Sequence, residues 1–303
     1  MTSFRDFEHA GWSDNSVAKS YHQHLGQVTV GCIPDLFDAA RFKRGDRVLD
    51  VACGAGYVAA AAHDRGAEAV GVDLSASQVR LAEQTYPSIR FIEGDAEALP
   101  FADGEFAAVL NAFGLPHISN ADKAAAEAHR VLKPGGRFAY ASWCVASACI
   151  GFSMVYDAVR AHGSLDVGLP PGPIFFGYGD PHYAREMLGR AGFSEVLVKE
   201  VPLVWRAADP DAVIEGISRA RCARRPSSTG RARTTLSRSS NTCGIGFLSS
   251  GKTALMRCRR RRWWSRAASR ADGIRAWLFR SRSSPRRVGC TILERCLRRS
   301  SGV

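Results

Sequence analysis

Short runs of β-branched residues alternate with stretches whose apolar residues recur every three or four positions through much of the chain before residue 218. The first pattern is typical of strands and the second of helices. It predicts strands at residues 47–51, 69–73, 89–93, 106–112, 137–142 and 195–201. It predicts helices at 58–65, 77–85, 121–132, 150–160 and 182–191, with one or two more within 13–38.

This alternation predicts an α/β fold, a Rossmann-like doubly wound sheet of mostly parallel strands. Right-handed crossovers bring the carboxyl ends of such strands to one edge, which is where ligands bind. The pattern loosens over residues 144–180, which include a Pro/Gly-rich aromatic stretch at 168–179. Because this region follows the fifth strand at the ligand edge, it is either a substrate cover or a variable surface loop.

The most informative stretch is Arg47–Val58, which reads RVLDVACGAGYV. A strand ends at Asp50, a turn holds Gly54 and Gly56, and a helix follows, an order that is typical of a nucleotide-binding corner. A strand-end carboxylate would repel the pyrophosphate of a dinucleotide. It suits S-adenosylmethionine, which has no phosphate and carries an ammonium and a sulfonium. The charge of Asp50 therefore favours S-adenosylmethionine.

Two more acids follow the next two predicted strands. Asp73 ends the second strand, where a carboxylate can accept hydrogen bonds from ribose hydroxyls. Asp95 follows the third strand, where it could accept from an adenine amino group. Three acids at three successive strand ends are hard to explain by the fold alone, so they indicate a ligand site.

Four ordered blocks, VLDVACGAG, GVDLSASQV, EGDAEALPFADGEF and VLKPGGRFAY, carry a family resemblance. The chain resembles class I S-adenosylmethionine-dependent methyltransferases of the broad quinone-pathway-like group (methyltransferase type 11) from about residue 39 to residue 201. The resemblance implies methyl transfer from S-adenosylmethionine to a small-molecule acceptor. It also implies a cofactor-binding set of Asp50, Ala52, Gly54, Gly56, Asp73, Leu74, Asp95, Ala96 and Asn111, with Ala52 in place of the usual first glycine.

Within that set, the resemblance gives Asp50, Gly54 and Gly56 to the methionine moiety and Asp73 and Leu74 to the ribose and adenine. Asp95 and Ala96 would meet the adenine edge, and Asn111 would lie near the sulfonium.

Methyl transfer is an in-line displacement, so the enzyme must position the nucleophile and, for a hydroxyl or carbon acceptor, take up a proton. His117, just past the fourth predicted strand, is the best-placed candidate base, although it could equally be a packing residue. His162, His182 and Asp157 are weaker candidates. The rival hypothesis is a remnant of the fold that binds the cofactor without turnover. The sequence identifies neither the acceptor nor its nucleophile.

The charge of the chain divides into two unlike parts. Residues 1–218 carry a net charge of −9 and residues 219–303 one of +21, which together give the +12 of the whole chain. We therefore expect a methyltransferase domain at 1–218 and an atypical Arg/Ser-rich tail at 219–303.

Three interpretations of the tail compete. A basic arm would bind nucleic acid. An ATP-binding loop matches residues 246–253 formally, but the segment lacks the required flanking strand, helix and acid, so we reject it. Out-of-frame sequence would explain the Arg, Ser, Cys and Trp bias. A one-base shift turns 219–229 into a mostly small and aliphatic series and 256–264 into a plausible last strand, so we favour this third interpretation and do not expect a nucleic-acid partner.

The frame hypothesis has a structural consequence. The family's sheet ends with an antiparallel strand inserted beside the 195–201 strand, and we expect that strand to be missing, with the tail irregular or disordered. Apolar residues such as Val196 and Val198 would then lose their cover, at about 1.5–3 kcal/mol for each large side chain.

The remaining features give coarser expectations. The polar start at residues 1–13 does not resemble a secretory signal, and the nine cysteines show no CxxC pair. We therefore expect a cytoplasmic protein with free thiols, no membrane association and no metal site.

Overall fold

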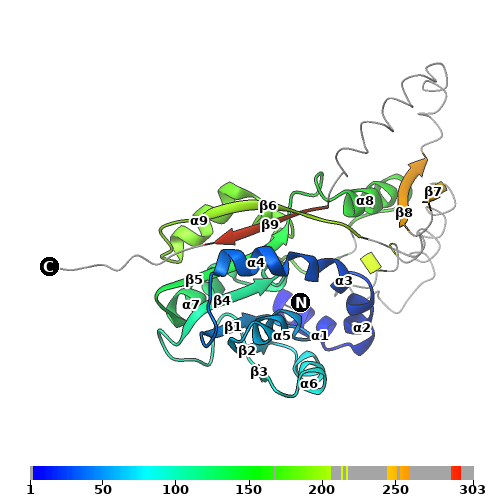
Figure 1. The fold of residues 1–303 in the computed structure, drawn as a ribbon. Helices are drawn as coiled ribbons and strands as arrows, with labels where there is room; N and C mark the ends of the chain where they lie inside the picture. The colour runs from blue at the N-terminus through cyan, green and yellow to red at the C-terminus, as the bar shows by residue number, and fades with distance from the viewer. Residues whose placement is uncertain are drawn as a thin grey trace.

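In the computed structural model, the described residues are 3–166, 168–205, 213, 216–217, 244–250, 253–259 and 288–294. Figure 1 shows a central sheet with helices around it. The α-helices are α1 (Phe4–Trp12), α2 (Asn15–Gln23), α3 (Gly26–Thr29), α4 (Ile33–Ala40), α5 (Tyr57–Asp64), α6 (Ala76–Thr85), α7 (Ala121–Val131), α8 (Ile150–His162) and α9 (Pro181–Arg190). The strands are β1 (Arg47–Val51), β2 (Glu68–Asp73), β3 (Arg90–Glu93), β4 (Phe106–Ala112), β5 (Leu132–Trp143), β6 (Leu197–Leu203), β7 (Gly244–Ser250), β8 (Thr253–Arg259) and β9 (Val288–Glu294). Short 3₁₀ turns are η1 (Val30–Cys32), η2 (Leu115–His117) and η3 (Gly177–Gly179).

The main sheet has the strand order β3-β2-β1-β4-β5-β9-β6. The first five strands are parallel, and β9 runs antiparallel to both of its neighbours. The strand order reverses between β1 and β4, and such a reversal opens a crevice at the carboxyl ends of the strands. The predicted Rossmann-like α/β fold is confirmed.

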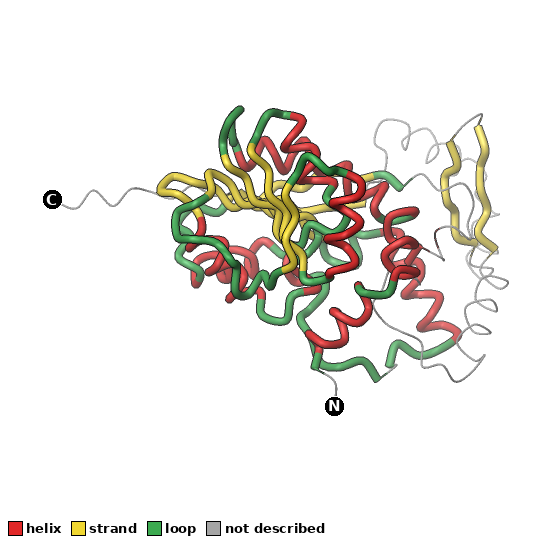
Figure 2. Tube along the Cα trace, turned by 90° about the horizontal axis from the view of Figure 1, so that it is seen from below, coloured by secondary structure: helices red, strands yellow, loops and turns green. Residues whose placement is uncertain are grey.

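Both faces of the sheet are covered, which explains why its inner strands are apolar on both sides. Val48 packs in one core with α4 and α5, whereas its neighbour Leu49 packs in the other core with α7 and α9. Figure 2 shows the strands lying between helices on the two sides. The strand ends that carry Asp50 and Asp73 are thereby fixed by packing on both faces.

The predicted strands and helices of residues 47–201 are all present, with shifts of a few residues at their ends. The helix α1 was not expected, because residues 1–13 look polar throughout. Its start is nevertheless encoded locally, since the Ser3 hydroxyl accepts a hydrogen bond from the backbone N–H of Asp6. A serine in this position satisfies one of the free N–H groups of a helix start.

The expectation that the last antiparallel strand is missing is wrong. β9 lies between β5 and β6 (Figure 1), pairing Cys290 with Trp143 on one side and with Val201 on the other. The segment reads VGCTILE and is rich in β-branched residues, which favour strands. Its backbone satisfies the N–H and C=O groups that β5 and β6 would otherwise leave unpaired. The strand pattern of residues 288–294 is short, and the arginine-rich composition of the surrounding tail obscures it.

A second part of the tail forms a hairpin. β7 and β8 pair antiparallel, with Ser250 opposite Thr253. The described residues 246–250 and 253 thus belong to two paired strands, not to a strand–loop–helix unit that would cradle phosphate. The prediction that the tail is irregular otherwise falls on residues outside the described part of the chain. No helix in the described part has the length and hydropathy needed to cross a membrane.

Candidate functional site

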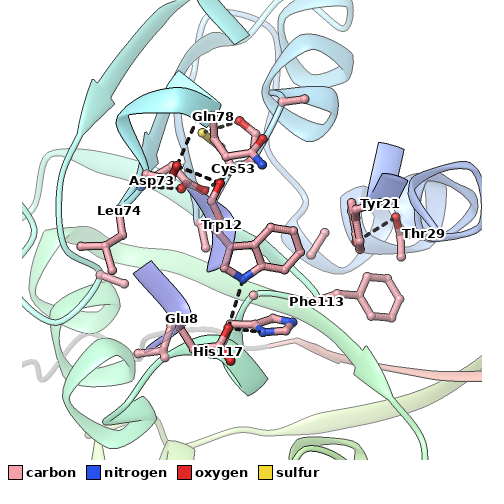
Figure 3. A pocket seen from close by; sticks show the side chains of 18 of the residues that line it. Glu8, Trp12, Tyr21, Thr29, Cys53, Asp73, Leu74, Gln78, Phe113 and His117 are labelled. Atoms are coloured by element: carbon pink, nitrogen blue, oxygen red, sulfur yellow. Dashed lines mark hydrogen bonds and ion pairs between the residues drawn. The ribbon is translucent and has the colours of Figure 1, made fainter. Parts of the chain in front are cut away.

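A cavity lies at the carboxyl ends of β1, β2 and β4, where the order of the strands reverses. Its floor comes from the turn after β1 and from the ends of β2 and β4, and its cover comes from α1 and α2 (Figure 3). The predicted site residues that line it are Asp50, Ala52, Gly54, Asp73, Leu74, Asp95, Ala96 and His117. Gly56 and Asn111 are outside this lining.

Asp73 ties the turn after β1 to the end of β2. One carboxylate oxygen accepts a hydrogen bond from the backbone N–H of Gly54 at 2.8 Å, and the other accepts from the N–H of Ser75 at 2.9 Å. Burial raises the pKa of Asp73, although both hydrogen bonds oppose that shift. The carboxylate is therefore held rigidly at the edge of the cavity.

Asp50 is the most deeply buried acid of the site, with 1% of its surface exposed. Its Oδ2 accepts a hydrogen bond from the backbone N–H of Ala59 at 3.0 Å, at the start of α5. Burial raises the pKa of Asp50 to about 8, and the nearby Asp73 adds to the rise. Desolvation disfavours the charged carboxylate, and a positively charged ligand in the cavity would favour it, so binding of a cation is coupled to ionisation of Asp50.

The turn between β1 and α5 requires left-handed backbone at three positions. Ala52, Gly54 and Gly56 have φ values of 55°, 53° and 84°. A Cβ on Gly56 would stand 2.7 Å from the ring of Phe91, so glycine is needed there for space as well as for conformation. Ala52 adopts the same region, which is unfavourable for a residue with a Cβ and is favoured by glycine.

Asp95 and Asn111 have structural partners. Asp95 forms an ion pair with Arg5 at 2.7 Å and accepts a hydrogen bond from the N–H of Glu97. Asn111 is buried, donates to the carbonyl of Val51 at 2.8 Å and accepts from the N–H of Gly114 at 3.1 Å. Asn111 thus joins the ends of β1 and β4, and the cavity wall is formed by the residues that follow it.

His117 ends the short turn η2 and faces the cavity. Its Nδ1 lies 2.8 Å from Oε2 of Glu8, and the same oxygen accepts a hydrogen bond from the indole N–H of Trp12 at 3.1 Å (Figure 3). The other candidate bases, Asp157, His162 and His182, are exposed on α8 and α9 and do not line the cavity. Of the four candidates, only His117 is positioned to meet a ligand there.

Sequence reasoning missed the contribution of the N-terminal helices. Glu8 and Trp12 come from α1, and Tyr21 and His22 from α2. The hydroxyls of Ser75 and Ser77 both donate to the backbone carbonyl of Trp12 at 3.2 Å, which fastens α1 over the end of β2. The available signals were the Ser3–Asp6 cap and two large aromatic residues within otherwise polar helices.

Comparison with known proteins agrees with this geometry. Residues 49–140 match the family model described as a methyltransferase domain. This chain contains a class I S-adenosylmethionine-dependent methyltransferase domain. The resemblance read from the four sequence blocks is thereby confirmed.

Curated relatives match part of this chain. The demethylmenaquinone methyltransferase of Renibacterium salmoninarum is 43% identical over 106 residues, which are 35% of this chain and 45% of the relative. An uncharacterised Mycobacterium tuberculosis protein is 36% identical over 163 residues, which are 52% of this chain and 57% of that protein. The chain spans about half the length of the curated relatives it matches.

Solved structures share the fold at low identity. The YcgJ protein of Bacillus subtilis covers 88% of this chain and 98% of its own, with a TM-score of 0.50 and 16% identity. Phosphoethanolamine N-methyltransferase 2 of Haemonchus contortus, solved with S-adenosylhomocysteine, covers 98% of this chain and 60% of its own. Its TM-score is 0.53 at 17% identity, so the likeness concerns the fold.

Proposed function

We propose that the methyltransferase chain transfers the methyl group of S-adenosylmethionine to a small-molecule acceptor bound in the cavity. The observation that carries this proposal is the pair of buried carboxyl groups, Asp50 and Asp73, at the ends of the adjacent strands β1 and β2. They flank the glycine turn and open onto one cavity that also holds a histidine.

The chemistry of this pair fits the cofactor. S-adenosylmethionine supplies a methyl group activated by a sulfonium, and it also carries an ammonium. A cation stabilises the ionised form of two desolvated acids, whereas the pyrophosphate of a dinucleotide would keep them protonated and gain no charge attraction. We assign Asp50, Ala52, Gly54 and Gly56 to the methionine side, through direct contact or through the shape of the turn.

Asp73 and Leu74 are assigned to the ribose and adenine, with Asp95 and Ala96 at the adenine edge. Asn111 acts on the site by holding the ends of β1 and β4 in register.

The acceptor side of the cavity is apolar and aromatic, with Phe113, Trp143, Phe152 and Phe175 in its wall. Such a wall binds an apolar acceptor and excludes water, while His117 is placed to take up a proton. Several relatives, including that of Renibacterium salmoninarum, are named demethylmenaquinone methyltransferases, and their name supports a small organic acceptor for this chain.

Turnover tests the proposal against a cofactor-binding remnant of the fold. The full chain is incubated with methyl-labelled S-adenosylmethionine and a panel of hydroxyl, amine, thiol and activated-carbon acceptors. We expect label to appear in at least one acceptor. Cofactor binding with no labelled product across the panel would favour the remnant.

Asp73→Ala tests the site itself. Loss of a charge-assisted hydrogen bond should weaken cofactor binding by about 1.5–3 kcal/mol, or about 10- to 150-fold. Glu83→Ala, an exposed acid on α6, serves as the control and should leave binding unchanged. Equal affinity of Asp73→Ala and the wild type in calorimetry would show that the ribose site is misplaced.

We further propose that residues 219–303 are translated out of frame, with residues 1–218 as the methyltransferase domain. The Arg-rich, Lys-poor composition of the tail supports this, whereas its net charge of +21 supports a nucleic-acid-binding arm. The pairing of β9 with β5 and β6 counts against the frame shift for residues 288–294. Sequencing the gene separates the two, since an open frame one base away near Arg219 is expected. A steeply salt-dependent nucleic-acid affinity lost on truncation, together with a stop-filled alternative frame, would favour the arm.

A further inference from the structure

We propose that Glu8 is a positioning residue that orients His117 to take the proton from a hydroxyl-bearing acceptor. This inference rests on the proposed methyl transfer and adds to it the nucleophile class and a residue of the N-terminal helix. Neither follows from the glycine turn and the acids that identify the cofactor site.

One carboxylate oxygen of Glu8 contacts two side chains that line the cavity. The Glu8 side chain is 9% exposed, and its Oε2 meets both His117 Nδ1 at 2.8 Å and Trp12 Nε1 at 3.1 Å (Figure 3). An indole N–H can only donate, so this oxygen is an acceptor. A carboxylate acceptor at Nδ1 favours the tautomer with the proton on Nδ1, which leaves Nε2 with its lone pair.

The lone pair on His117 Nε2 is accessible to a ligand in the cavity. His117 lines the cavity, and no hydrogen bond within the described part of the chain engages its Nε2. The ring lies close enough to Asp73 to act on its charge. The basic nitrogen is therefore available to a ligand in the cavity.

Aromatic side chains continue from His117 around the cavity. Each ring contacts the next, with centroid separations of 5.2 Å for Trp12–His117, 5.8 Å for His117–Phe175, 6.1 Å for Phe175–Phe152, 5.0 Å for Phe152–Trp143 and 4.4 Å for Trp143–Phe113. All six line the cavity. This arc suits a ring-bearing acceptor, because aromatic faces and edges pack well against one another.

In the proposed step, proton transfer to His117 accompanies methyl transfer to the acceptor oxygen. The acceptor O–H bond breaks and its proton passes to His117 Nε2, while the acceptor oxygen forms a bond to the methyl carbon. The bond from that carbon to sulfur breaks, and its electron pair stays on sulfur, which becomes a neutral thioether. Glu8 stabilises the imidazolium that results. A neutral amine already presents a lone pair, so a preorganised base is needed most for an acceptor that loses a proton, and a hydroxyl is the class of such acceptor proposed here.

A purely structural role for Glu8 would be to hold α1 in place. However, α1 is already fastened by the Arg5–Asp95 ion pair at 2.7 Å and by the hydroxyls of Ser75 and Ser77 on the Trp12 carbonyl. Glu8→Gln keeps the shape of the side chain and these other contacts. It should therefore alter the histidine without releasing the helix.

Nitrogen-15 NMR of the full chain with labelled histidine tests the orientation without turnover. His117→Asn identifies the signal. With S-adenosylmethionine bound, we expect His117 protonated at Nδ1 in the neutral form, and a mixed or reversed tautomer in Glu8→Gln. Glu186→Gln is a matched control, since Glu186 lies 3.4 Å from His182 in an exposed pair on α9. A His117 tautomer that is protonated at Nε2, or that Glu8→Gln leaves unchanged, overturns the proposal.

Kinetics with two matched acceptors test the proton transfer. 1-Naphthol holds its proton at pH 8, whereas 4-nitro-1-naphthol is ionised there and needs no base. We expect Glu8→Gln to lower kcat for 1-naphthol by about 100-fold and to change kcat for the nitro compound far less, with cofactor affinity unchanged. Equal losses for both acceptors, or methylation of amines or thiols but of neither naphthol, overturn the proposal.

Cofactor titration separates this inference from the proposed function. If S-adenosylmethionine does not bind, the proposed function fails. If it binds normally and neither naphthol is methylated, the acceptor class assigned here fails, while the cofactor site stands.

Discussion

Replacing Asp50 by asparagine should stabilise the ligand-free protein while weakening cofactor binding. Asp50 is buried, and within the described part of the chain its side chain accepts one hydrogen bond, from Ala59 N–H to Oδ2. Asparagine retains an oxygen for that bond and has the same shape, but it cannot ionise. The substitution therefore isolates the effect of the carboxyl group's charge.

The magnitude follows from the pKa of Asp50. Burial raises it from 3.8 to about 8 in the folded chain. Between about pH 4 and pH 8 the unfolded chain has lost this proton and the folded chain has kept it, so rising pH favours unfolding. The free energy of unfolding falls by at most about 1.4 kcal/mol per pH unit from this one group. At pH 7 this limit is about 4 kcal/mol, and we expect Asp50→Asn to recover about 2–4 kcal/mol.

Denaturant unfolding of the full chain, followed by tryptophan fluorescence at pH 5 and pH 8, measures the effect. The gain should be small at pH 5 and larger at pH 8, while calorimetry shows weaker S-adenosylmethionine binding in the same variant. Asp64→Asn, an exposed acid at the end of α5, is the control and should change neither quantity.

If Asp50→Asn destabilises the free protein and leaves its pH dependence as in the wild type, Asp50 is ionised in the folded state without a ligand. The argument that desolvation prepares this site for a cation would then be wrong.

Three other predictions concern the same turn. Ala52→Gly should raise the free energy of unfolding by about 0.5–1 kcal/mol, because φ of 55° is strained for alanine. Chemical denaturation measures this gain, and no change would mean that the strain is relaxed elsewhere. Gly56→Ala should cost about 2–3 kcal/mol, since its Cβ would stand 2.7 Å from Phe91 at a φ of 84°; wild-type stability in the same assay would contradict the turn geometry. Cofactor binding at pH 7 should release close to one proton, because a cation beside Asp50 favours its ionised form. Calorimetry in two buffers of different ionisation enthalpy measures the number of protons released, and a value of zero would contradict the prediction.

The cofactor side of the site was predictable because its chemistry is written in short, local patterns. Asp50 and Asp73 lie at strand ends and Gly54 in the turn after the first of them, and the alternation of strands and helices brings such ends to one edge. The need for a left-handed residue at Ala52 is visible only in the backbone. Gly56 and Asn111 were included in the cofactor set by resemblance, and the structure places both outside the cavity lining.

The acceptor side was less accessible, because it depends on contacts between distant segments. Glu8 and His117 are 109 positions apart, and the local signals of α1, the Ser3–Asp6 cap and Trp12, do not tell which part of the sheet the helix covers. The strand β9 was missed for a different reason. Its residues 288–294 have a strand pattern, but they lie within a tail whose arginine content dominated the interpretation.

The central claim is that this cavity binds S-adenosylmethionine, and calorimetric titration of the full chain tests it most directly. S-adenosylmethionine and NAD are titrated separately into the wild type and into Asp73→Ala. We predict saturable binding of S-adenosylmethionine, weakened about 10- to 150-fold by the substitution, and no comparable binding of NAD. Preferential binding of NAD, or S-adenosylmethionine binding that is the same in both proteins, would contradict the account.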